Sequence, residues 1–336
     1  MPEVGVGERL KTVVVGYGFI GRVHSERWSK IDEAKLTAVV DIVPERAREA
    51  AETYRCNAYT SLSEALDREK PDIVDICTPT YTHKQLVLEA LNAHANVVCE
   101  KPLALSLQDC REIIKAAKES GMKFMVAHCL RFFPDYSTVK RLVEGGEVGE
   151  PRIARAYRLS AKPGWATWYL NQDKSGGVMV DLAIHDIDFL RWLFADEVSR
   201  VYAQALKPRD VKAQTHAQVL LKFRKGYIAF VEASWSMPDG FPFTTYFEVA
   251  GTDGIVLLDS RASTPLTVHR KGGVEELSPV GRDGYLLELQ HFARCVLEDK
   301  APMVSGEEAV KTLEVCFAAV ESSLTGEPVN LPLEGV

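Results

Sequence analysis

Near its start the chain places three spaced glycines between a short apolar run and an amphipathic stretch. Residues 12–15 lead directly into Gly16-Tyr17-Gly18-Phe19-Ile20-Gly21. Between a strand and a helix, a G-x-G-x-x-G motif binds the diphosphate of a dinucleotide. Its first glycine permits the tight turn, its second lets the backbone approach the diphosphate, and its third lets the helix pack on the strand. The motif predicts a βαβ unit that holds an anion at the N-terminus of its helix.

Runs rich in Val and Ile alternate with amphipathic stretches through the first 128 residues. The runs lie at 12–15, 36–40, 73–77, 96–99 and 123–126, and the amphipathic stretches at about 19–31, 44–55, 61–69, 82–94 and 106–120. Runs that are apolar throughout suit strands covered on both faces, and this alternation indicates a parallel sheet with right-handed crossovers. Ser106 and Asp109 form a capping box, and Gly121 is expected to end that helix. We predict an α/β fold in which residues 9–130 form a Rossmann domain with a doubly wound parallel sheet.

The pattern changes after about residue 130, which agrees with the two domains that a length of 336 residues favours. Helices are expected near 135–144, 177–194, 284–298 and 305–324, and strands near 152–160, 214–223, 226–236, 243–251, 254–259 and 265–270. Tight turns at Arg224-Lys225-Gly226 and Asp253-Gly254 join successive strands. Residues 131–333 are therefore predicted to form a C-terminal α+β domain with an open, mainly antiparallel sheet. Its last helix, 305–324, could also pack back on the Rossmann domain.

Composition excludes several classes of protein. The chain has 47 acidic and 40 basic residues, a net charge of −7, which argues against nucleic acid as a partner. No apolar stretch approaches the ~20 residues that cross a bilayer, so we expect no membrane contact and no signal peptide. The seven cysteines include no C-x-x-C pair, so we expect packing residues in a reducing, cytoplasmic protein, without a disulfide framework or a metal site.

An acidic residue stands where a dinucleotide site needs one. Asp41 comes 20 residues after Gly21, at the end of the second predicted strand. A carboxylate there accepts a hydrogen bond from the ribose 2′-hydroxyl and would repel a 2′-phosphate. The sequence therefore predicts NAD in preference to NADP as the cofactor, although Arg46 and Arg48 follow in the next helix.

Two segments carry side chains suited to catalysis. Lys101 directly follows the fifth strand, at the carboxyl edge where open α/β sheets bind ligands, but a surface lysine in a turn would look the same. Asp181 and His185 stand four residues apart, so a helix would place them on one face. The alternative for this pair is a capped helix with a hydrogen-bonded histidine on its polar side.

Further candidates lie at the domain junction and in a loop rich in glycine, proline and aromatic residues. Arg131 could hold an anionic or hydroxyl-rich ligand, or could form an ion pair between domains. Trp165, Trp168 and Tyr169 could stack on a sugar or could pack as an interface core.

Taken together, these residues resemble the glucose–fructose oxidoreductase / inositol dehydrogenase / MocA (Gfo/Idh/MocA) family along essentially the whole chain. The motifs behind the resemblance are the glycine turn, Cys77-Thr78-Pro79 with His83, Glu100-Lys101-Pro102, and Ser175-Gly176-Gly177 followed by Asp181 and His185. Two positions depart from the family pattern: Ser175 replaces a common glycine, and Ala183 stands where glycine is frequent.

The resemblance implies a role for each matching residue. Lys101 would contact the nicotinamide ribose and the substrate, Asp181 would orient the substrate, and His185 would be the general acid/base. Glu100 and Pro102 would shape the turn, and Thr78, Pro79 and His83 would line the cofactor groove. The implied cofactor-binding set is Gly16, Gly18, Phe19, Ile20, Gly21, Asp41, Thr78, Pro79, His83, Glu100 and Lys101. The implied substrate-binding set is Lys101, Arg131, Trp165, Asp181 and His185.

The implied activity is hydride transfer between nicotinamide and a secondary hydroxyl of a polyol or sugar, as in an inositol 2-dehydrogenase. His185 would move the hydroxyl proton, and Lys101 would stabilise the developing charge. Two alternatives stay open: a glycoside hydrolase that uses NAD, and a dinucleotide sensor without catalysis. Apolar residues on both faces of the second sheet, such as Phe223, Phe230, Trp235 and Tyr246, favour a homodimer or homotetramer through that sheet.

Overall fold

The computed structural model describes residues 9–164, 166–279, 281 and 283–333. Within this part the chain divides into two compact units. The first contains the described residues up to 127 together with 283–308, and the second contains those of 128–282 together with the segment from 309 onward.

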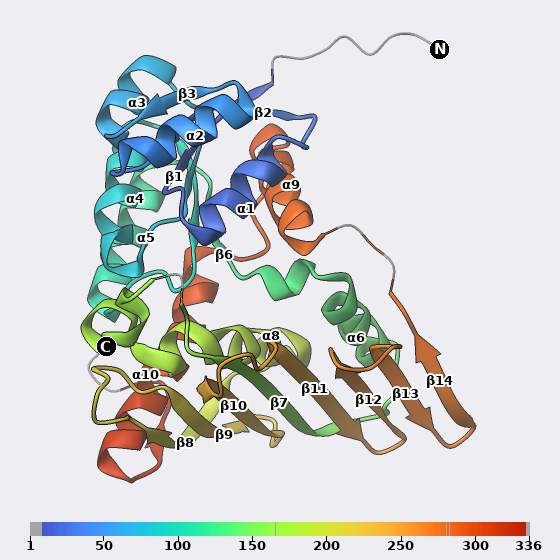
Figure 1. The fold of residues 1–336 in the computed structure, drawn as a ribbon. Helices are drawn as coiled ribbons and strands as arrows, with labels where there is room; N and C mark the ends of the chain where they lie inside the picture. Colours follow the sequence, from blue (N-terminus) through green and yellow to red (C-terminus); the bar gives the residue numbers. More distant parts are fainter. Residues whose placement is uncertain (1–8, 165, 280, 282, 334–336) are drawn as a thin grey trace, which may run out of the picture. The chain divides into compact units, whose positions relative to one another are not determined.

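The first unit is built on a six-stranded sheet in the order β3-β2-β1-β4-β5-β6, with every pair parallel (Figure 1). The strands are β1 (Leu10–Val15), β2 (Ala34–Val40), β3 (Asn57–Tyr59), β4 (Ile73–Ile76), β5 (Asn96–Glu100) and β6 (Phe124–Ala127). The direction of strand addition reverses between β1 and β4, which is the point where such sheets bind ligands. The predicted doubly wound Rossmann sheet is confirmed. The sequence did not predict β3, which is three residues long and has no buried residue.

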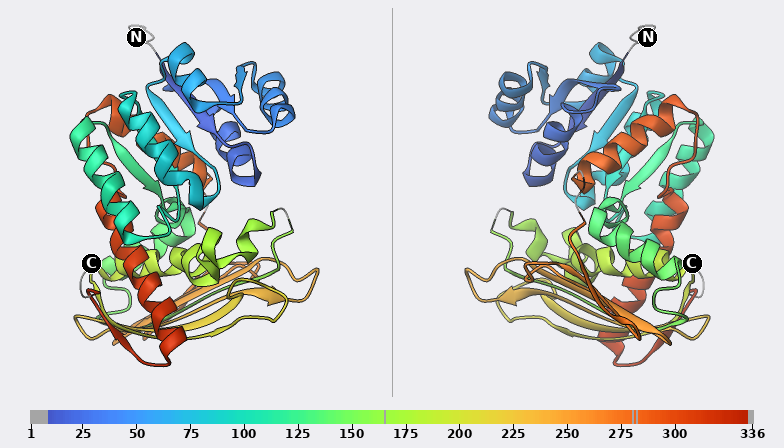
Figure 2. Two further views of the ribbon diagram at one scale, coloured as in Figure 1. Left: turned by 90° about the vertical axis from the view of Figure 1, so that its left-hand side faces the viewer. Right: turned by 90° about the vertical axis from the view of Figure 1, so that its right-hand side faces the viewer.

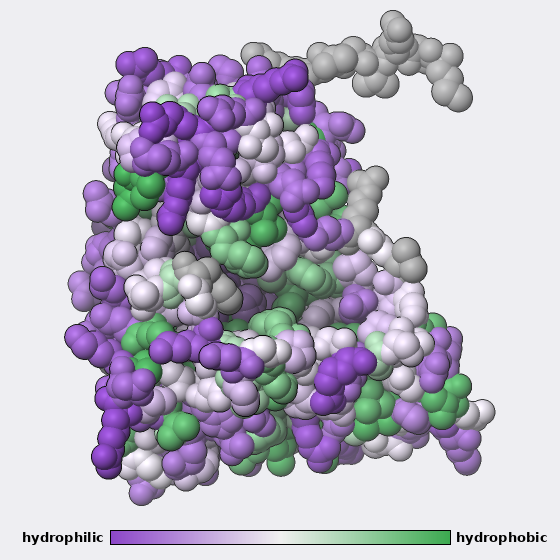
Figure 3. Space-filling model, viewed as in Figure 1, coloured by the Kyte–Doolittle hydropathy of each residue, from purple (hydrophilic) through white to green (hydrophobic). Residues whose placement is uncertain are grey.

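Right-handed crossovers distribute the helices over the two faces of this sheet. The helices are α1 (Phe19–Trp28), α2 (Pro44–Tyr54), η1 (Thr80–Thr82), α3 (Leu62–Glu69), α4 (His83–Asn92) and α5 (Leu107–Ser120). The predicted capping of α5 is confirmed, because Ser106 Oγ accepts a hydrogen bond from the Asp109 N–H at 3.1 Å and Gly121 ends the helix at a φ of +71°. The outer surfaces of α2 and α3 are mainly hydrophilic (Figure 3).

A late helix returns to the first unit. The sequence prediction assigned residues 131–333 to one domain and considered a return only for the helix 305–324, but α9 (Gly284–Leu297) groups with the parallel sheet. Arg27 of α1 forms an ion pair with Asp283 at 3.1 Å, and the ring of Tyr285 lies 6.0 Å from that of His24. These partners are more than 250 residues apart in the chain, so local sequence patterns give no sign of the return.

The second unit is built on a nine-stranded sheet in the order β14-β13-β12-β11-β7-β10-β9-β8-β15. The strands are β7 (Pro151–Ala161), β8 (Val198–Leu206), β9 (His216–Phe223), β10 (Ile228–Met237), β11 (Thr244–Gly251), β12 (Gly254–Asp259), β13 (Leu266–Arg270), β14 (Gly273–Leu277) and β15 (Val329–Asn330). Only β7 and β10 pair in parallel, so the predicted open, mainly antiparallel sheet is confirmed. The sequence did not predict β8, β14 or β15. The edge strand β14 is almost entirely exposed and therefore lacks an apolar pattern.

Helices cover one face of this second sheet (Figure 2). They are η2 (Cys129–Phe132), α6 (Pro134–Glu144), η3 (Trp168–Leu170), α7 (Gln172–Ser175), η4 (Met179–Ala183), α8 (Ile184–Phe194) and α10 (Gly306–Thr325). Only the first turn of α10 belongs to the first unit. Phe223 and Trp235, considered as residues of the outer face, are buried. Phe230 and Tyr246 are half-buried and alternate with buried neighbours along their strands.

All seven cysteines are free thiols, and every one except Cys56 is buried, as expected for packing residues. Within the described part of the chain, no helix combines the length and apolar character needed to cross a membrane.

Candidate active site

The glycine turn after β1 leaves no room for a side chain at two of its three glycines. Gly16 has a φ of +92°, and a Cβ there would lie 2.7 Å from the Cys77 carbonyl oxygen. A Cβ on Gly21 would lie 1.8 Å from the Gly16 carbonyl oxygen. Gly18, in contrast, has no protein atom within 4 Å of its Cβ position. Protein packing therefore requires Gly16 and Gly21, whereas the space beside Gly18 leaves its backbone accessible to a ligand.

Asp41 follows β2, and its carboxylate binds a backbone N–H of the glycine turn. Its Oδ2 accepts a hydrogen bond from the Tyr17 N–H at 2.7 Å, and its Oδ1 accepts one from the Val43 N–H at 2.8 Å. A carboxylate oxygen has a second lone pair, so the same group can also accept from a ribose hydroxyl. In the turn itself, Ile20 is half-buried and Phe19 is exposed.

His83, the first residue of α4, joins the loops that follow β4 and β5. Its Nε2 faces the Thr78 carbonyl oxygen at 2.8 Å, and its Nδ1 faces the Pro102 carbonyl oxygen at 3.0 Å. Burial lowers the pKa of His83. The residue is 1% exposed, so it supports the two loops from the interior, and its place beside the cofactor stays a prediction. Thr78 and Pro79 are half-buried.

Glu100 and Lys101 stand at the carboxyl end of β5. Glu100 is buried, and its Oε2 accepts a hydrogen bond from the Lys101 N–H at 3.1 Å. Lys101 is half-buried. Because β5 is next to β4 and β4 next to β1, Lys101, Thr78 and the glycine turn lie along one edge of the parallel sheet. The prediction that Lys101 directly follows the fifth strand is therefore confirmed.

Sequence reasoning missed two buried residues in this region. His24 of α1 and Asp75 of β4 are both 0% exposed and lie 2.8 Å apart between Nδ1 and Oδ2. The available signal was a single carboxylate inside an otherwise apolar central strand, because a buried charge needs a buried partner.

Ser175-Gly176-Gly177 turns the second unit's chain into a π-helix. Gly176 and Gly177 have φ values of +75° and +76°, and a Cβ on either would lie 2.5 Å from a neighbouring side chain. The Ser175 hydroxyl accepts a hydrogen bond from the Gly177 N–H at 3.0 Å. The sequence predicted one α-helix over 177–194, but η4 is π-helical and α8 begins only at Ile184. Apolar periodicity does not reveal a π-helical turn. Such turns are rare in proteins as a whole but occur frequently at functional sites.

Asp181 and His185 lie on either side of the junction between η4 and α8. Asp181 is buried and His185 is half-buried. Four residues make about one turn of helix, so the two side chains leave the same side of this segment. A carboxylate beside an imidazole can orient a hydroxyl group and exchange a proton with it.

The two aspartates that follow His185 anchor α8 through buried ion pairs. Arg158 of β7 binds both oxygens of Asp186 at 3.0 and 3.1 Å. Arg131 of η2 binds both oxygens of Asp188 at 2.7 and 2.8 Å. Burial would raise the pKa of Asp188, but the charges of His128 and Arg131 outweigh it and lower that pKa to about 2.

This geometry identifies a partner of Arg131 that the sequence did not. Its guanidinium is buried against the Asp188 carboxylate of the same unit, and this ion pair positions α8. Of the aromatic loop residues, Trp165 lies outside the described residues. The rings of Trp168 and Tyr169 stack 3.9 Å apart, Tyr169 packs edge-on against Trp235 at 6.0 Å, and Trp168 and Tyr169 are both half-buried.

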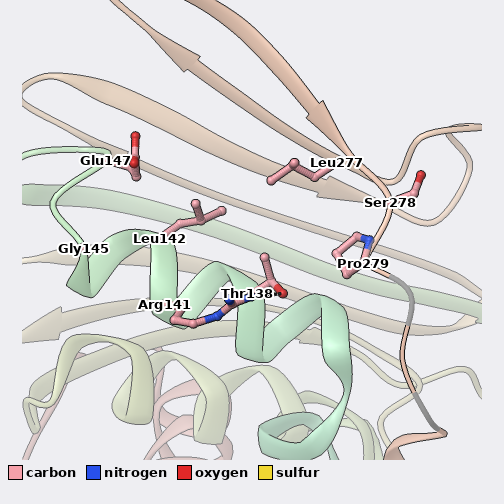
Figure 4. A pocket seen from close by; sticks show the side chains of 8 residues that line it. All are labelled: Thr138, Arg141, Leu142, Gly145, Glu147, Leu277, Ser278 and Pro279. Carbon is pink, nitrogen blue, oxygen red and sulfur yellow. Dashed lines mark hydrogen bonds between the residues drawn. The ribbon is translucent and has the colours of Figure 1, made fainter.

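A separate hollow of about 390 Å³ lies between α6 and the end of β14 (Figure 4). Its lining residues are Thr138, Arg141, Leu142, Gly145, Glu147, Leu277, Ser278 and Pro279. None of them belongs to the predicted site, and Glu147 is paired with Arg270.

The first unit fits NAD. The space at the Gly18 Cβ position, the ten-residue α1 that starts there and the Asp41 carboxylate are the features that a dinucleotide requires. Gly16 and Gly18 would hold the diphosphate and Asp41 the adenosine ribose.

Comparison with known proteins agrees with this geometry. The family model GFO_IDH_MocA, an oxidoreductase family with an NAD-binding Rossmann fold, matches residues 10–128, and the GFO/IDH/MocA C-terminal domain matches residues 136–257. The chain is 30% identical to scyllo-inositol 2-dehydrogenase (NAD(+)) of Bacillus subtilis (strain 168), over 97% of each chain. It is also 30% identical to myo-inositol 2-dehydrogenase of Thermotoga maritima, over 93% of this chain and 96% of that protein.

A solved structure gives the same result. The crystal structure of GenD2 from gentamicin A biosynthesis, in complex with NAD, matches with a TM-score of 0.87 and 25% identity over 99% of each chain. The fold, the glycine turn and these matches lead to one conclusion: the chain belongs to the GFO/IDH/MocA oxidoreductase family and is an NAD-binding dehydrogenase.

Proposed function

We propose that this dehydrogenase oxidises a secondary hydroxyl of a cyclic polyol or sugar, in the manner of an inositol 2-dehydrogenase. The observation that carries the proposal is the Asp181–His185 pair at the junction of the π-helical η4 and α8, in a chain whose other unit has the NAD-binding glycine turn. The two inositol dehydrogenases at 30% identity support the choice of a hydroxyl-rich ring as substrate.

In this proposal each catalytic side chain has one task. NAD, when bound, supplies the hydride acceptor. His185 removes the hydroxyl proton, a task suited to imidazole because its affinity for protons matches neutral pH. The Lys101 ammonium stabilises the negative charge that develops on the oxygen, and in the reverse direction it polarises the carbonyl. Asp181 orients His185 or a neighbouring substrate hydroxyl.

The test is a screen for NAD reduction over inositols, aldoses and nucleotide sugars, followed by variants. His185→Ala should lower kcat at least ~10²-fold and leave NAD affinity nearly unchanged, because loss of a general acid/base acts on the chemical step. Lys101→Met should also lower kcat. The control is His269→Ala, which removes an exposed histidine of the same unit.

Each other result has a definite meaning. Wild-type turnover in His185→Ala would remove His185 from the proton-transfer role. Release of an aglycone with NAD that stays bound would select the hydrolase, and NAD binding without turnover over the whole screen would select the sensor.

We further propose that a second copy of the chain covers the outer face of the nine-stranded sheet. Tyr202, Leu220 and Phe230 are register partners on the neighbouring strands β8, β9 and β10, and form an apolar row. Ile228 and Ile153 are partners on β10 and β7 and are 47% and 45% exposed. Leu220→Lys should shift the protein to a smaller species in light scattering, and a wild-type monomer would contradict the proposal. The seven free thiols fit a reducing compartment such as the cytoplasm.

A further inference from the structure

A buried histidine lies between two carboxylates beneath the Lys101 turn. His24 Nδ1 lies 2.8 Å from Asp75 Oδ2, and its Nε2 lies 3.3 Å from Glu100 Oε1. His24 and Asp75 are 0% exposed and Glu100 is 7% exposed. The three residues come from α1, β4 and β5, so the histidine connects elements that are not consecutive in the chain.

The contacts around this histidine favour its protonated form. Asp75 accepts hydrogen bonds from Trp28 Nε1 at 2.7 Å and from the Cys77 thiol at 3.4 Å. Nδ1 of His24 is hydrogen-bonded to Asp75, and its Nε2 lies at ion-pair distance from Glu100, so both nitrogens have a carboxylate oxygen nearby. Burial lowers the pKa of His24, but the charge of Asp75 outweighs it and raises that pKa well above its usual value. The ring lies between two carboxylates, and its raised pKa favours the protonated, charged form.

Glu100 connects His24 with the backbone of Lys101. One carboxylate oxygen of Glu100 faces His24, and the other accepts the Lys101 N–H at 3.1 Å. On the far side of Lys101, His83 faces the carbonyl oxygen of Pro102. The backbone of Lys101 is thus held on both sides by residues with buried side chains.

We propose that His24 is a positioning residue, which ties the Glu100-Lys101-Pro102 turn to β4 and so sets the direction in which Lys101 leaves the sheet. The inference rests on the proposed role of Lys101 in hydride transfer. His24 does not touch the substrate in this scheme, because it is completely buried.

A metal-binding site is the alternative interpretation of the buried cluster of His24, Asp75 and Cys77. The ligand atoms of His24, Asp75 and Cys77 lie within 4.8 Å of one another. With bond lengths of about 2.0–2.1 Å, two N or O ligands of a tetrahedral zinc ion stand about 3.3 Å apart. The His24–Asp75 distance of 2.8 Å is shorter and is that of a charge-assisted hydrogen bond.

Two amide substitutions test the contact of His24 with Asp75 and its contact with Glu100 separately. The amide nitrogen of His24→Asn can replace Nδ1 and bind Asp75 but cannot reach Glu100, whereas that of His24→Gln can replace Nε2 and bind Glu100. His24→Asn should lower kcat by ~10–100-fold, because small displacements of a catalytic group have effects of this size. His24→Gln should lose less, and both should bind NAD as the wild type does.

Hydrogen–deuterium exchange of the peptide that contains Lys101 gives a readout without substrate. Exchange of the Lys101 amide should become faster in His24→Asn than in His24→Gln, because only the former loses the contact with Glu100. The matched control is His94→Asn, at an exposed histidine of the same unit with a φ of +57°, which asparagine tolerates. If no polyol is oxidised by the wild type, the proposed function fails while this exchange measurement still decides the inference.

A third variant keeps the inference testable if the two His24 variants do not fold. In Glu100→Gln only one terminal atom is an acceptor, so the side chain cannot accept from both His24 and the Lys101 N–H. It keeps the His24–Asp75 pair and should still raise the exchange of the Lys101 amide and lower kcat. The inference is overturned by equal losses in His24→Asn and His24→Gln, by wild-type exchange and kcat in Glu100→Gln, or by one equivalent of zinc in the purified protein.

Discussion

The two units carry their candidate residues on different scaffolds. In the first, Gly16, Asp41 and Lys101 follow the carboxyl ends of parallel strands, and backbone contacts such as that of Asp41 with the Tyr17 N–H hold them. In the second, Asp181 and His185 lie on a helical segment anchored by buried ion pairs. A turn held by its backbone depends on a local motif, whereas a site on a helix depends on side chains from distant strands and loops.

The largest expected effect tests this dependence in the second unit. Arg131→Met leaves Asp188 buried without its two-fold hydrogen-bonded partner, which should lower the free energy of unfolding by about 3–5 kcal/mol. Urea unfolding followed by circular dichroism measures it. Arg152→Met is the control, because Arg152 and Glu150 are both 59% exposed and their pair should contribute almost nothing. Equal stability of the two variants would show that α8 does not depend on this ion pair.

A pair of glycine variants tests the turn of the first unit. Gly21→Ala should lower the free energy of unfolding by about 1–3 kcal/mol, because its Cβ meets the Gly16 carbonyl oxygen. Gly18→Ala should leave stability unchanged and weaken NAD binding, because its Cβ meets no protein atom and would fill the space for the diphosphate. Thermal unfolding and titration with NADH separate the two effects. Normal NADH affinity in Gly18→Ala would place the diphosphate elsewhere.

The ion pair between Asp188 and Arg131 should make the stability that α8 contributes depend on pH. The folded pKa of Asp188 is about 2, below its ordinary 3.8, so its contribution is present above about pH 4 and is lost as the pH falls through 2. A shift of this size corresponds to about 2 kcal/mol. The stability difference between the wild type and Asp188→Asn should therefore shrink from pH 5 to pH 2. A constant difference would mean that Asp188 does not titrate as an ion-pair partner.

The smallest expected effect concerns the cofactor carboxylate. Asp41→Asn should weaken NAD binding about tenfold, since a hydrogen bond to a charged group contributes about 1.5 kcal/mol. It should also reduce the discrimination against NADP, because the charge that repels a 2′-phosphate is gone. Affinities for both dinucleotides measure this, with Asp67→Asn, an exposed carboxylate of the same unit, as control. Stronger binding of NADP than NAD by the unmodified protein would contradict the role of Asp41.

Local motifs predicted the features that depend on neighbouring residues. The glycine turn, the Ser106 cap and the Asp253-Gly254 turn between β11 and β12 all stand where the sequence placed them. The alternation of apolar runs also predicted the parallel sheet of the first unit and the different sheet of the second. Their backbone conformations follow from residues a few positions apart, which a single sequence displays.

Only the tertiary structure decided which buried groups pair. His24 and Asp75 are 51 residues apart, Arg131 and Asp188 are 57 apart, and α9 returns to a unit that the chain left at residue 127. The sequence shows each of these residues with several available partners, and it did not identify Asp188 as the partner of Arg131. Burial determines which groups pair, because a charge removed from water is stable only beside the partner that the fold brings to it.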